Sequence, residues 1–446
     1  MKKIVVIPAL LLLTVLLAAC GGGGGGGNNT STNPAALADL ELSAGALDQI
    51  FQSSQFDYTS TVGYLATETT VTPTTADAAA TVTVNGAAVA SGSASDPIPL
   101  AVGANTITVI VTASDGVTTN TYTVTVTRES AAQFAQRAYI KASNTDSGAN
   151  FGYSVALSGD TLAVGAPGEA SNARGINGDQ GDTSAPNAGA VYVFTRSGTT
   201  WSQQAYVKAS NTRQDYAFGG SVALDGDTLA VGSTGEASNA KVIDGDQNNT
   251  LAPGAGAVYV FIRSGTTWTQ QAYVKASNTD SGDNFGYSVA LSGDTLAVGA
   301  IGEASDGSSP LNNSLSGAGA AYVFTRSNTT WAPQAYIKAS DPAPASDDNF
   351  GWSLALFDDT LVVGAPGRNT YTGAGYLYTR SSGTWSQLAY FQASNPDVNA
   401  SFGASLALTD DMLAVGAPGE ASNATGIDGN QNDTSMPNAG AVYTFQ

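Results

Sequence analysis

The chain has 446 residues, of which 12% are charged, and 36 acidic residues against 16 basic ones give a net charge of −20. Because this length exceeds one ordinary core and the chain contains 52 Gly, several small all-β units are expected rather than one domain. The negative charge disfavours phosphate backbones and anionic lipid surfaces, so we expect no nucleic acid partner.

The first twenty residues have the pattern of a targeting segment rather than of a folded element. Lys2 and Lys3 precede an apolar stretch, 4–17, that is too short to span a bilayer, and "LAAC" places small residues before Cys20. This segment resembles a bacterial lipoprotein signal with its lipobox. The resemblance implies cleavage before Cys20, lipid attachment there and a membrane anchor in the bacterial envelope, with Gly21 implying the outer membrane. The alternative is an ordinary secretory peptide with a chance cysteine.

Residues 21–36 contain seven consecutive Gly after Cys20 and little apolar content, which predicts a flexible tether. From 37 to 128, apolar residues alternate with polar ones in short runs such as "ATVTVNGAAVA" and "NTITVIVTASDG". Period-two alternation with NG and DG turns predicts antiparallel strands with one buried face. The region resembles the cadherin-like β-sandwich domain of bacterial surface proteins, and 129–135 is expected to be a linker.

From 136 to 446 the chain repeats itself. "AYIKAS" or a close variant recurs at Ala138, Ala205, Ala272, Ala335 and Ala389. Each repeat predicts four strands, written in the first as "FGYSVAL", "TLAVGAP", "GAVYVF" and "WSQQAYVKAS". Large residues alternate with small ones, so both faces of each sheet can be buried between neighbouring sheets. Four strands in each repeat indicate the blade of a β-propeller.

The repeat resembles the FG-GAP repeat, the propeller unit of integrin alpha subunits. The "GAP" part stands at Gly165, Gly364 and Gly416 and becomes "GST" at Gly232 and "GAI" at Gly299. The resemblance implies a propeller that binds ligands with one face. Integrin-type calcium loops between the first two strands are replaced here by short turns, so the metal residues of the family cannot be carried over. The "FG" pairs are Phe151 and Gly152, Phe218 and Gly219, Phe285 and Gly286, Phe350 and Gly351, and Phe402 and Gly403.

The two ends of this region predict how the ring closes. The region opens with a fourth-strand sequence, "QRAYIKAS", preceded by Phe134, and the fifth repeat ends after its third strand. We therefore expect five four-stranded blades, with the N-terminal strand completing the last blade and removing both exposed edges. The alternative is that these blades are part of a larger, seven-bladed ring.

Long polar loops between the second and third strands are expected to share one face with the loops that link repeats, and to carry recognition. Asn177, Asp306 and Asn312 are possible ligand-face residues. Three of these loops carry alternating side chains with oxygen atoms. Such a pattern can form either a Ca²⁺-binding loop or a series of Asx and Gly turns. Because the spacing is not that of an EF-hand, turns are favoured. The candidate metal residues are Asp179, Asp182, Asp244, Asp246, Asn248, Asp428, Asn430 and Asn432.

Four tryptophans, Trp201, Trp268, Trp331 and Trp385, begin the fourth strands, where a role in covering the blade core is favoured over stacking on sugars. The chain contains no His, and its single Cys falls in the lipobox, so the sequence predicts no catalytic residues and no enzyme. The first hypothesis is a monomeric, lipid-anchored adhesion or binding protein with a protein or glycan ligand. The alternatives are a lectin-like propeller and a structural envelope protein.

Overall fold

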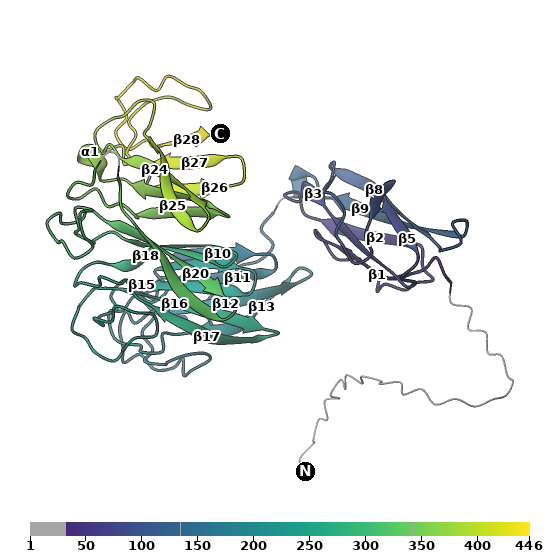
Figure 1. The fold of residues 1–446 in the computed structure, drawn as a ribbon, viewed down its shortest axis with the longest axis horizontal. Helices are drawn as coiled ribbons and strands as arrows, with labels where there is room; N and C mark the ends of the chain where they lie inside the picture. The colour runs from purple at the N-terminus through teal and green to yellow at the C-terminus, as the bar shows by residue number, and fades with distance from the viewer. Residues whose placement is uncertain (1–32, 134, 341–342) are drawn as a thin grey trace, which may run out of the picture. The chain divides into compact units, whose positions relative to one another are not determined.

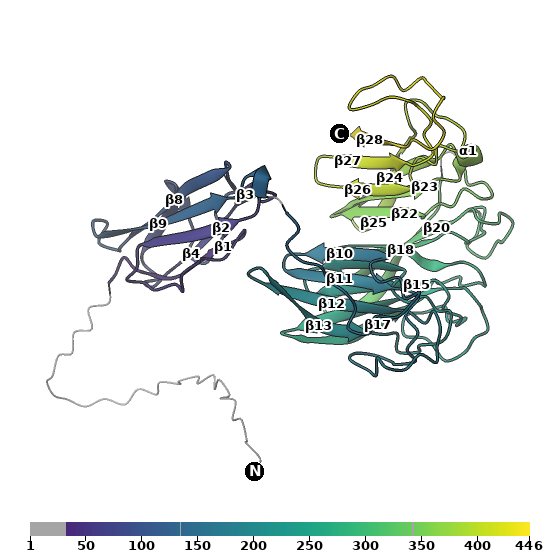
Figure 2. The same cartoon turned by 180° about the vertical axis from the view of Figure 1, so that it is seen from behind.

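The structure is a computed structural model that describes residues 33–133, 135–340 and 343–446. The chain forms two compact units, one ending at Gln136 and the other spanning Arg137–Gln446 (Figures 1 and 2). The proposed signal, Cys20 and Phe134 lie outside the described residues. Both units are built of strands, which confirms the all-β class. Within the described ranges, no helix has the length and apolar character that a membrane crossing needs.

The first unit is a β-sandwich. Its larger sheet has the order β2-β9-β8-β5-β6, in which β2 and β9 are parallel, and β1 pairs with β4. Side chains alternate between buried and exposed along β9, where Tyr122, Val124 and Val126 are fully buried. Asn85 and Gly86 both have positive φ in the β5–β6 turn, as the NG dipeptide predicts. The elements are β1 Leu37–Leu42, β2 Asp57–Val62, β3 Glu68–Thr69, β4 Val71–Thr75, β5 Thr81–Val84, β6 Ala87–Val89, β7 Ile98–Pro99, β8 Gly103–Thr112, β9 Thr119–Arg128 and the 3-10 turn η1 Ala131–Gln133.

The second unit contains five consecutive antiparallel sheets, here called sheets 1 to 5, one from each repeat. Sheets 1 to 4 have four strands each and sheet 5 has three. The strands are β10 Ser154–Ser158, β11 Thr161–Ala166, β12 Ala190–Ser197 and β13 Thr200–Val207; β14 Ser221–Asp225, β15 Thr228–Ser233, β16 Ala257–Ser264 and β17 Thr267–Val274; β18 Phe285–Ser292, β19 Thr295–Ala300, β20 Ala320–Ser327 and β21 Thr330–Ile337; β22 Ser353–Phe357, β23 Thr360–Ala365, β24 Ala374–Ser381 and β25 Thr384–Phe391; and β26 Ser405–Leu408, β27 Leu413–Ala417 and β28 Ala441–Phe445, with one helical turn, α1 Arg368–Tyr371, in the fourth repeat.

Consecutive sheets are joined by a contact between two glycines. At the joint between sheets 2 and 3, the Ser221 hydroxyl donates a hydrogen bond to the carbonyl of Gly286 at 2.7 Å. A Cβ atom on Gly232 would lie 2.1 Å from that same carbonyl oxygen, so no side chain fits there. Gly286 itself has φ +89°, a conformation that L residues disfavour. The hydrogen bond recurs from Ser154 to Gly219, from Ser288 to Gly351 and from Ser353 to Gly403.

The "FG" phenylalanines fill the space beside this joint. Phe285 is fully buried, and its ring meets the ring of Tyr322 edge-on at a centroid distance of 5.2 Å. Its backbone also forms a parallel bridge with Gly256 of the preceding repeat. The "FG" and "GAP" segments are therefore the two halves of one sheet-to-sheet contact.

The array is open between sheets 5 and 1, so the predicted closing strand is wrong. Residues 136–143 form no strand, and β28 has no partner on its outer side in the described part of the chain. Instead, Ile140 and Ala142 pack against the core of sheet 1. The fifth sheet keeps three strands because the segment that was expected to complete it is held at the other end of the array.

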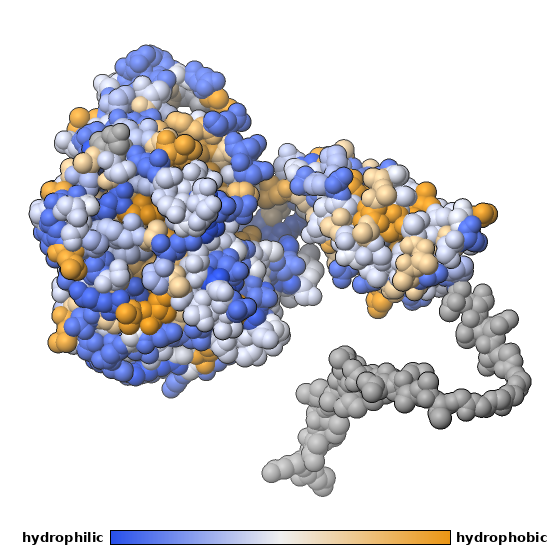
Figure 3. Space-filling model, in the orientation of Figure 1, coloured by the Kyte–Doolittle hydropathy of each residue, from blue (hydrophilic) through white to orange (hydrophobic). Residues whose placement is uncertain are grey.

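The outer face of β10 is exposed as a consequence. Tyr153, Val155 and Leu157 were expected to be buried between blades, but they are 70%, 64% and 65% exposed because no sheet precedes them. Gly152 likewise faces open space, with no atom within 4 Å of the position of a Cβ. The surface in Figure 3 is mostly hydrophilic, with separate hydrophobic patches.

The glycine joint predicts unequal effects of the same substitution in two repeats. Gly232→Ala should lower the unfolding free energy by roughly 3 kcal/mol, because its Cβ would meet the Gly286 carbonyl. Gly416→Ala in sheet 5 should cost less, since its Cβ meets only Ser405, whose side chain can rotate. Thermal melts followed by circular dichroism compare the two variants, and equal losses would contradict an uncovered sheet 5.

Candidate functional face

Long loops between the second and third strands of the repeats gather at one end of the sheets (Figure 1). They span 167–189, 234–256, 301–319 and 418–440, while the fourth repeat has only 366–373. We call this end the loop face. The opposite end carries the short turns between the first and second strands and between the third and fourth strands.

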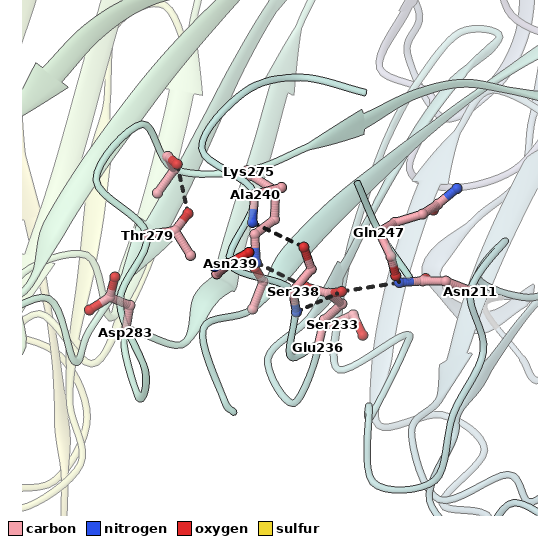
Figure 4. Close-up of polar contacts among 12 residues, drawn as sticks. Asn211, Ser233, Glu236, Ser238, Asn239, Ala240, Gln247, Lys275, Thr279 and Asp283 are labelled. Carbon is pink, nitrogen blue, oxygen red and sulfur yellow. Dashed lines mark hydrogen bonds and ion pairs between the residues drawn. The ribbon is translucent and has the colours of Figure 1, made fainter. Parts of the chain in front are cut away.

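Each long loop begins at a buried acidic residue. In the second repeat, both Glu236 and Lys275 have fully buried side chains, and Lys275 Nζ lies 2.8 Å from Glu236 Oε2 (Figure 4). Asn211 donates to the other oxygen of Glu236 at 3.0 Å and to the carbonyl of Gln247 at 2.8 Å. The backbone N–H of Ser238 also donates to Glu236. One carboxylate therefore connects the fourth strand, the loop and the segment before the first strand.

The cluster recurs in the first and third repeats. Lys208 lies 2.6 Å from Glu169, and Lys338 lies 2.8 Å from Glu303. Burial lowers the pKa of all three lysines, and the adjacent glutamates oppose this shift. Buried pairs of this kind are costly to break, because removing one partner leaves the other charge without compensation. The clusters fix the bases of the loops.

The fourth and fifth repeats depart from this pattern. Arg368 stands where the other repeats have Glu, and it pairs instead with Asp348 at 2.5 Å. In the fifth repeat, Glu420 is 1% exposed and accepts hydrogen bonds from Asn395 and Ser422 but forms no ion pair with a described residue. Its lysine is missing because sheet 5 lacks a fourth strand.

Asp283 occupies the position of Asp348 in the third repeat, but without an arginine beside it. Asp283 is 4% exposed, and its carboxylate accepts the backbone N–H of Asp280 at 2.8 Å. Burial raises its pKa to about 7, and the charges of Glu303 and Asp280 add to the effect. It lies near the cluster of the second repeat in Figure 4.

The sequence-predicted residues Asn177, Asp244 and Asp428 occupy equivalent positions in their loops and all have positive φ. The side-chain oxygens of Asn177 and Asp244 accept the backbone N–H groups of Tyr206 and Tyr273, at 2.9 and 2.8 Å. They attach the loop to the fourth strand of their own sheet. Asp428 is exposed, because sheet 5 has no such strand.

Other predicted metal residues turn their oxygens towards their own loops. Asp182 accepts the N–H of Ser184 at 2.7 Å, which, with the serine side chain, lowers the pKa of Asp182. Asp306 and Asn312, which were predicted as ligand-face residues, are hydrogen-bonded to each other, with the Asn312 side-chain N–H donating to Asp306 Oδ2 at 2.8 Å. The remaining contacts are two residues apart and have the Asx-turn pattern, which favours the turn interpretation. Asp179 accepts from Gly181, Asp246 from Asn248 and Asn430 from Asn432.

No group of three or more acidic or Cys side chains that could hold a metal ion occurs among the described residues. What the loop face offers is a rigid base of buried ion pairs with exposed polar and apolar groups above it. Such an arrangement suits non-covalent recognition.

The tryptophans are used in packing between sheets. Trp268 and Trp331 are 2% and 4% exposed, and their indole N–H groups donate to Gln204 and Gln271 of the preceding sheet at 2.7 and 2.8 Å. Arg263 lies over the Trp268 ring at 5.3 Å and pairs with Asp227 in the turn of its own sheet. These contacts agree with the packing interpretation rather than with sugar stacking.

The buried glutamate–lysine pairs were missed by sequence reasoning. Their signal was present, because Glu recurs after "GAP" or its variants and Lys recurs in "AYVKAS". Two opposite charges that recur in phase with a repeat are candidates for a pair within each unit. The burial of both charges could not be read from spacing.

The fold and the loop face define a tandem β-repeat protein with an N-terminal sandwich domain. Comparison with family models matches residues 36–129 to the cadherin-like beta sandwich domain. The FG-GAP repeat matches 134–194, 201–261, 268–324, 331–378 and 385–445, which together are more than half of the chain. The protein therefore belongs to the FG-GAP repeat family, and both predicted resemblances of the folded part are confirmed. A search of curated proteins finds no match.

Asp283 predicts a specific pH dependence. In the folded protein the pKa of Asp283 is raised above the ordinary value of 3.8. The free energy of unfolding therefore falls as the pH rises from about 4 to 7 and this carboxyl group ionises. Asp283→Asn should therefore raise the unfolding free energy at pH 8 by roughly 2–4 kcal/mol and change it little at pH 4. Asp348→Asn, which removes the partner of Arg368, should instead destabilise at pH 8. Denaturant melts at both pH values test this, and a lower stability of Asp283→Asn at pH 8 would contradict it.

The Asx turns predict no calcium response. Adding CaCl₂ to chelator-treated protein should leave the melting temperature unchanged relative to NaCl at equal ionic strength, because the loop oxygens already accept backbone N–H groups. A rise in melting temperature that depends on calcium concentration would support the cation interpretation instead.

Proposed function

We propose that this protein is a cell-surface binding or adhesion protein that recognises its ligand with the loop face. Its FG-GAP repeats are of the kind that form integrin-like propellers, which are commonly ligand-binding or adhesive. The N-terminal segment supports a lipid anchor at Cys20 in a bacterial envelope, in the outer membrane. The Gly-rich tether and the sandwich would then hold the repeats away from the membrane.

The observation that carries the proposal is a set of exposed apolar side chains on the loop face. Val242, Leu251, Leu311 and Ile427 lie in three different long loops and are 63%, 72%, 72% and 93% exposed. Exposed apolar groups surrounded by polar residues at one end of an array mark interaction sites. The loop bases are held by buried clusters, so these side chains are presented from a fixed frame.

The loops are not the same in every repeat although most of their bases are alike. After a shared "GEAS", "NARGINGDQGDT" and "NATGIDGNQNDT" are similar, "NAKVIDGDQNNT" is related to them, and "DGSSPLNNSLS" is different, while the fourth repeat has only the short loop 366–373. Repeats that keep a common base and vary their tips form one composite surface rather than identical sites. This favours a single partner over the row of equivalent sugar sites that the lectin alternative assumed.

A binding test distinguishes the loop face from the rest of the surface. The chain without residues 1–32 is immobilised to capture partners from envelope extracts, and the double variant Leu251→Ser with Leu311→Ser should reduce capture roughly tenfold. Leu388→Ser, in β25 and 66% exposed, is the matched control and should leave capture unchanged. Equal capture by both variants, or a loss with Leu388→Ser alone, would refute the proposal.

A further inference from the structure

A polar pocket lies on the loop face where the first and second repeats meet. Its volume is about 440 Å³, within the range of small-molecule sites. The long loop of the first repeat contributes Asn172 and Arg174, the segment before β14 contributes Arg213 and Tyr216, and the next long loop contributes Thr250. We call it the Arg–Tyr pocket.

Its two arginines differ from most basic residues of this unit, which are committed to ion pairs. Arg174 and Arg213 form no ion pair with any described residue, and Arg213 donates only to the backbone carbonyl of Asn248, at 3.0 Å. Both are exposed at the rim of one pocket in a chain of charge −20. The committed residues include Arg196, Lys208, Arg263, Lys275, Arg326, Lys338, Arg368 and Arg380.

Tyr216, which lines the same pocket, has a buried hydroxyl. Tyr216 is 3% exposed, and its hydroxyl forms no hydrogen bond with the described residues; the nearby N–H of Ala237 does not reach hydrogen-bond geometry. Burial raises the pKa of Tyr216, the charge of Glu236 adds to the rise, and the charges of Arg213 and Arg174 oppose it. A buried polar group is normally hydrogen-bonded, so a tyrosine with an unpaired hydroxyl is unusual beside a pocket.

The pocket is specific to this junction of repeats. Arg213 stands five residues before the "FG" phenylalanine, where the first, third and fifth repeats have Asp146, Asp280 and Asp397. Tyr216 stands where those repeats have Ala149, Asp283 and Ala400. Two substitutions thus turn a junction of acidic or small residues into one with a cation and a tyrosine.

We propose that the Arg–Tyr pocket binds an acidic sugar, with its carboxylate between Arg174 and Arg213. The inference rests on the proposed function only in placing the ligand on the loop face. Arginine is the preferred partner of carboxylates because its donors form a planar fork. The hydroxyl and amide groups of Asn172, Gln214 and Thr250 provide partners for sugar hydroxyls.

Two further observations favour a sugar over an acidic peptide. The lining contains one small apolar residue, Ala185, and no large aliphatic side chain to hold a peptide. The net charge of −20 repels an extended polyanion such as an acidic peptide. A ligand with a single carboxylate is instead attracted by the two arginines beside it.

The acidic neighbours of the pocket are already engaged. Asp182 accepts from Ser184, and Asp215 accepts from Asn187 and Gln214 at 3.0 and 3.1 Å. Glu236, which also acts on Tyr216, is paired with Lys275.

Calorimetric titration of the full chain in mild detergent with glucuronate, glucose and triglutamate tests the proposal. Glucuronate should bind with a dissociation constant on the order of 1 mM, at least tenfold more tightly than glucose, and less tightly at high salt. Arg213→Ala and Arg174→Ala should each weaken binding about tenfold with an unchanged melting temperature, because both side chains are exposed. Lys241→Ala, in the next loop and outside the lining, is the matched control and should bind as the parent does.

No glucuronate binding, equal binding of glucose, or tighter binding of triglutamate would overturn the proposal. So would unchanged affinity in Arg213→Ala and Arg174→Ala, whose exposed side chains can be removed without loss of core packing. Capture of a partner through Leu251 and Leu311 does not depend on this pocket, so failure here is distinguishable from failure of the proposed function.

Discussion

A hydrogen bond from a serine hydroxyl to a glycine carbonyl joins each sheet to the next, at a point where neither glycine can carry a side chain. The bond brings two backbones into contact, and the buried phenylalanine beside it fixes the depth at which the sheets meet. Because the contact needs small residues on one sheet and a positive φ on the next, both halves must be present in every repeat. The repetition of the sequence is therefore a requirement of assembly, since an isolated sheet would leave both halves unused.

Two separate sets of polar contacts hold the ends of the sheets. At the end with short turns, Arg263 pairs with Asp227, lies over Trp268 and donates to Thr161 of the preceding sheet at 2.8 Å. This ion pair is largely exposed on the Asp227 side, so its electrostatic contribution is small and its packing matters more. At the loop face the pairs are buried, and they connect strand, loop and segment within one repeat. The arginines of the short-turn end thus link neighbouring sheets, while the buried ion pairs of the loop face act within one repeat.

The repeated strands and their turns could be predicted because alternation and turn dipeptides are local signals. The position of residues 136–143 could not, since Ile140 and Ala142 have the same apolar pattern whether they complete a distant sheet or pack on the nearest one. The uncovered face of β10 follows from that non-local outcome. The Arg–Tyr pocket combines residues from two repeats, so only the packing of the two sheets brings them together.

In the fourth repeat, residues 366–373 connect the second and third strands, and this loop is less than half as long as the loops of the other repeats. The two strands nevertheless pair in the same register as elsewhere, with Gly364 opposite Gly375. Loop length is therefore uncoupled from the sheet that carries it. Arg368 and Asp348 replace the usual glutamate and lysine with a self-contained pair of opposite polarity. Each repeat can consequently gain or lose loop residues in evolution without disturbing its neighbours, as an exchangeable cassette does, and new specificities can arise one unit at a time.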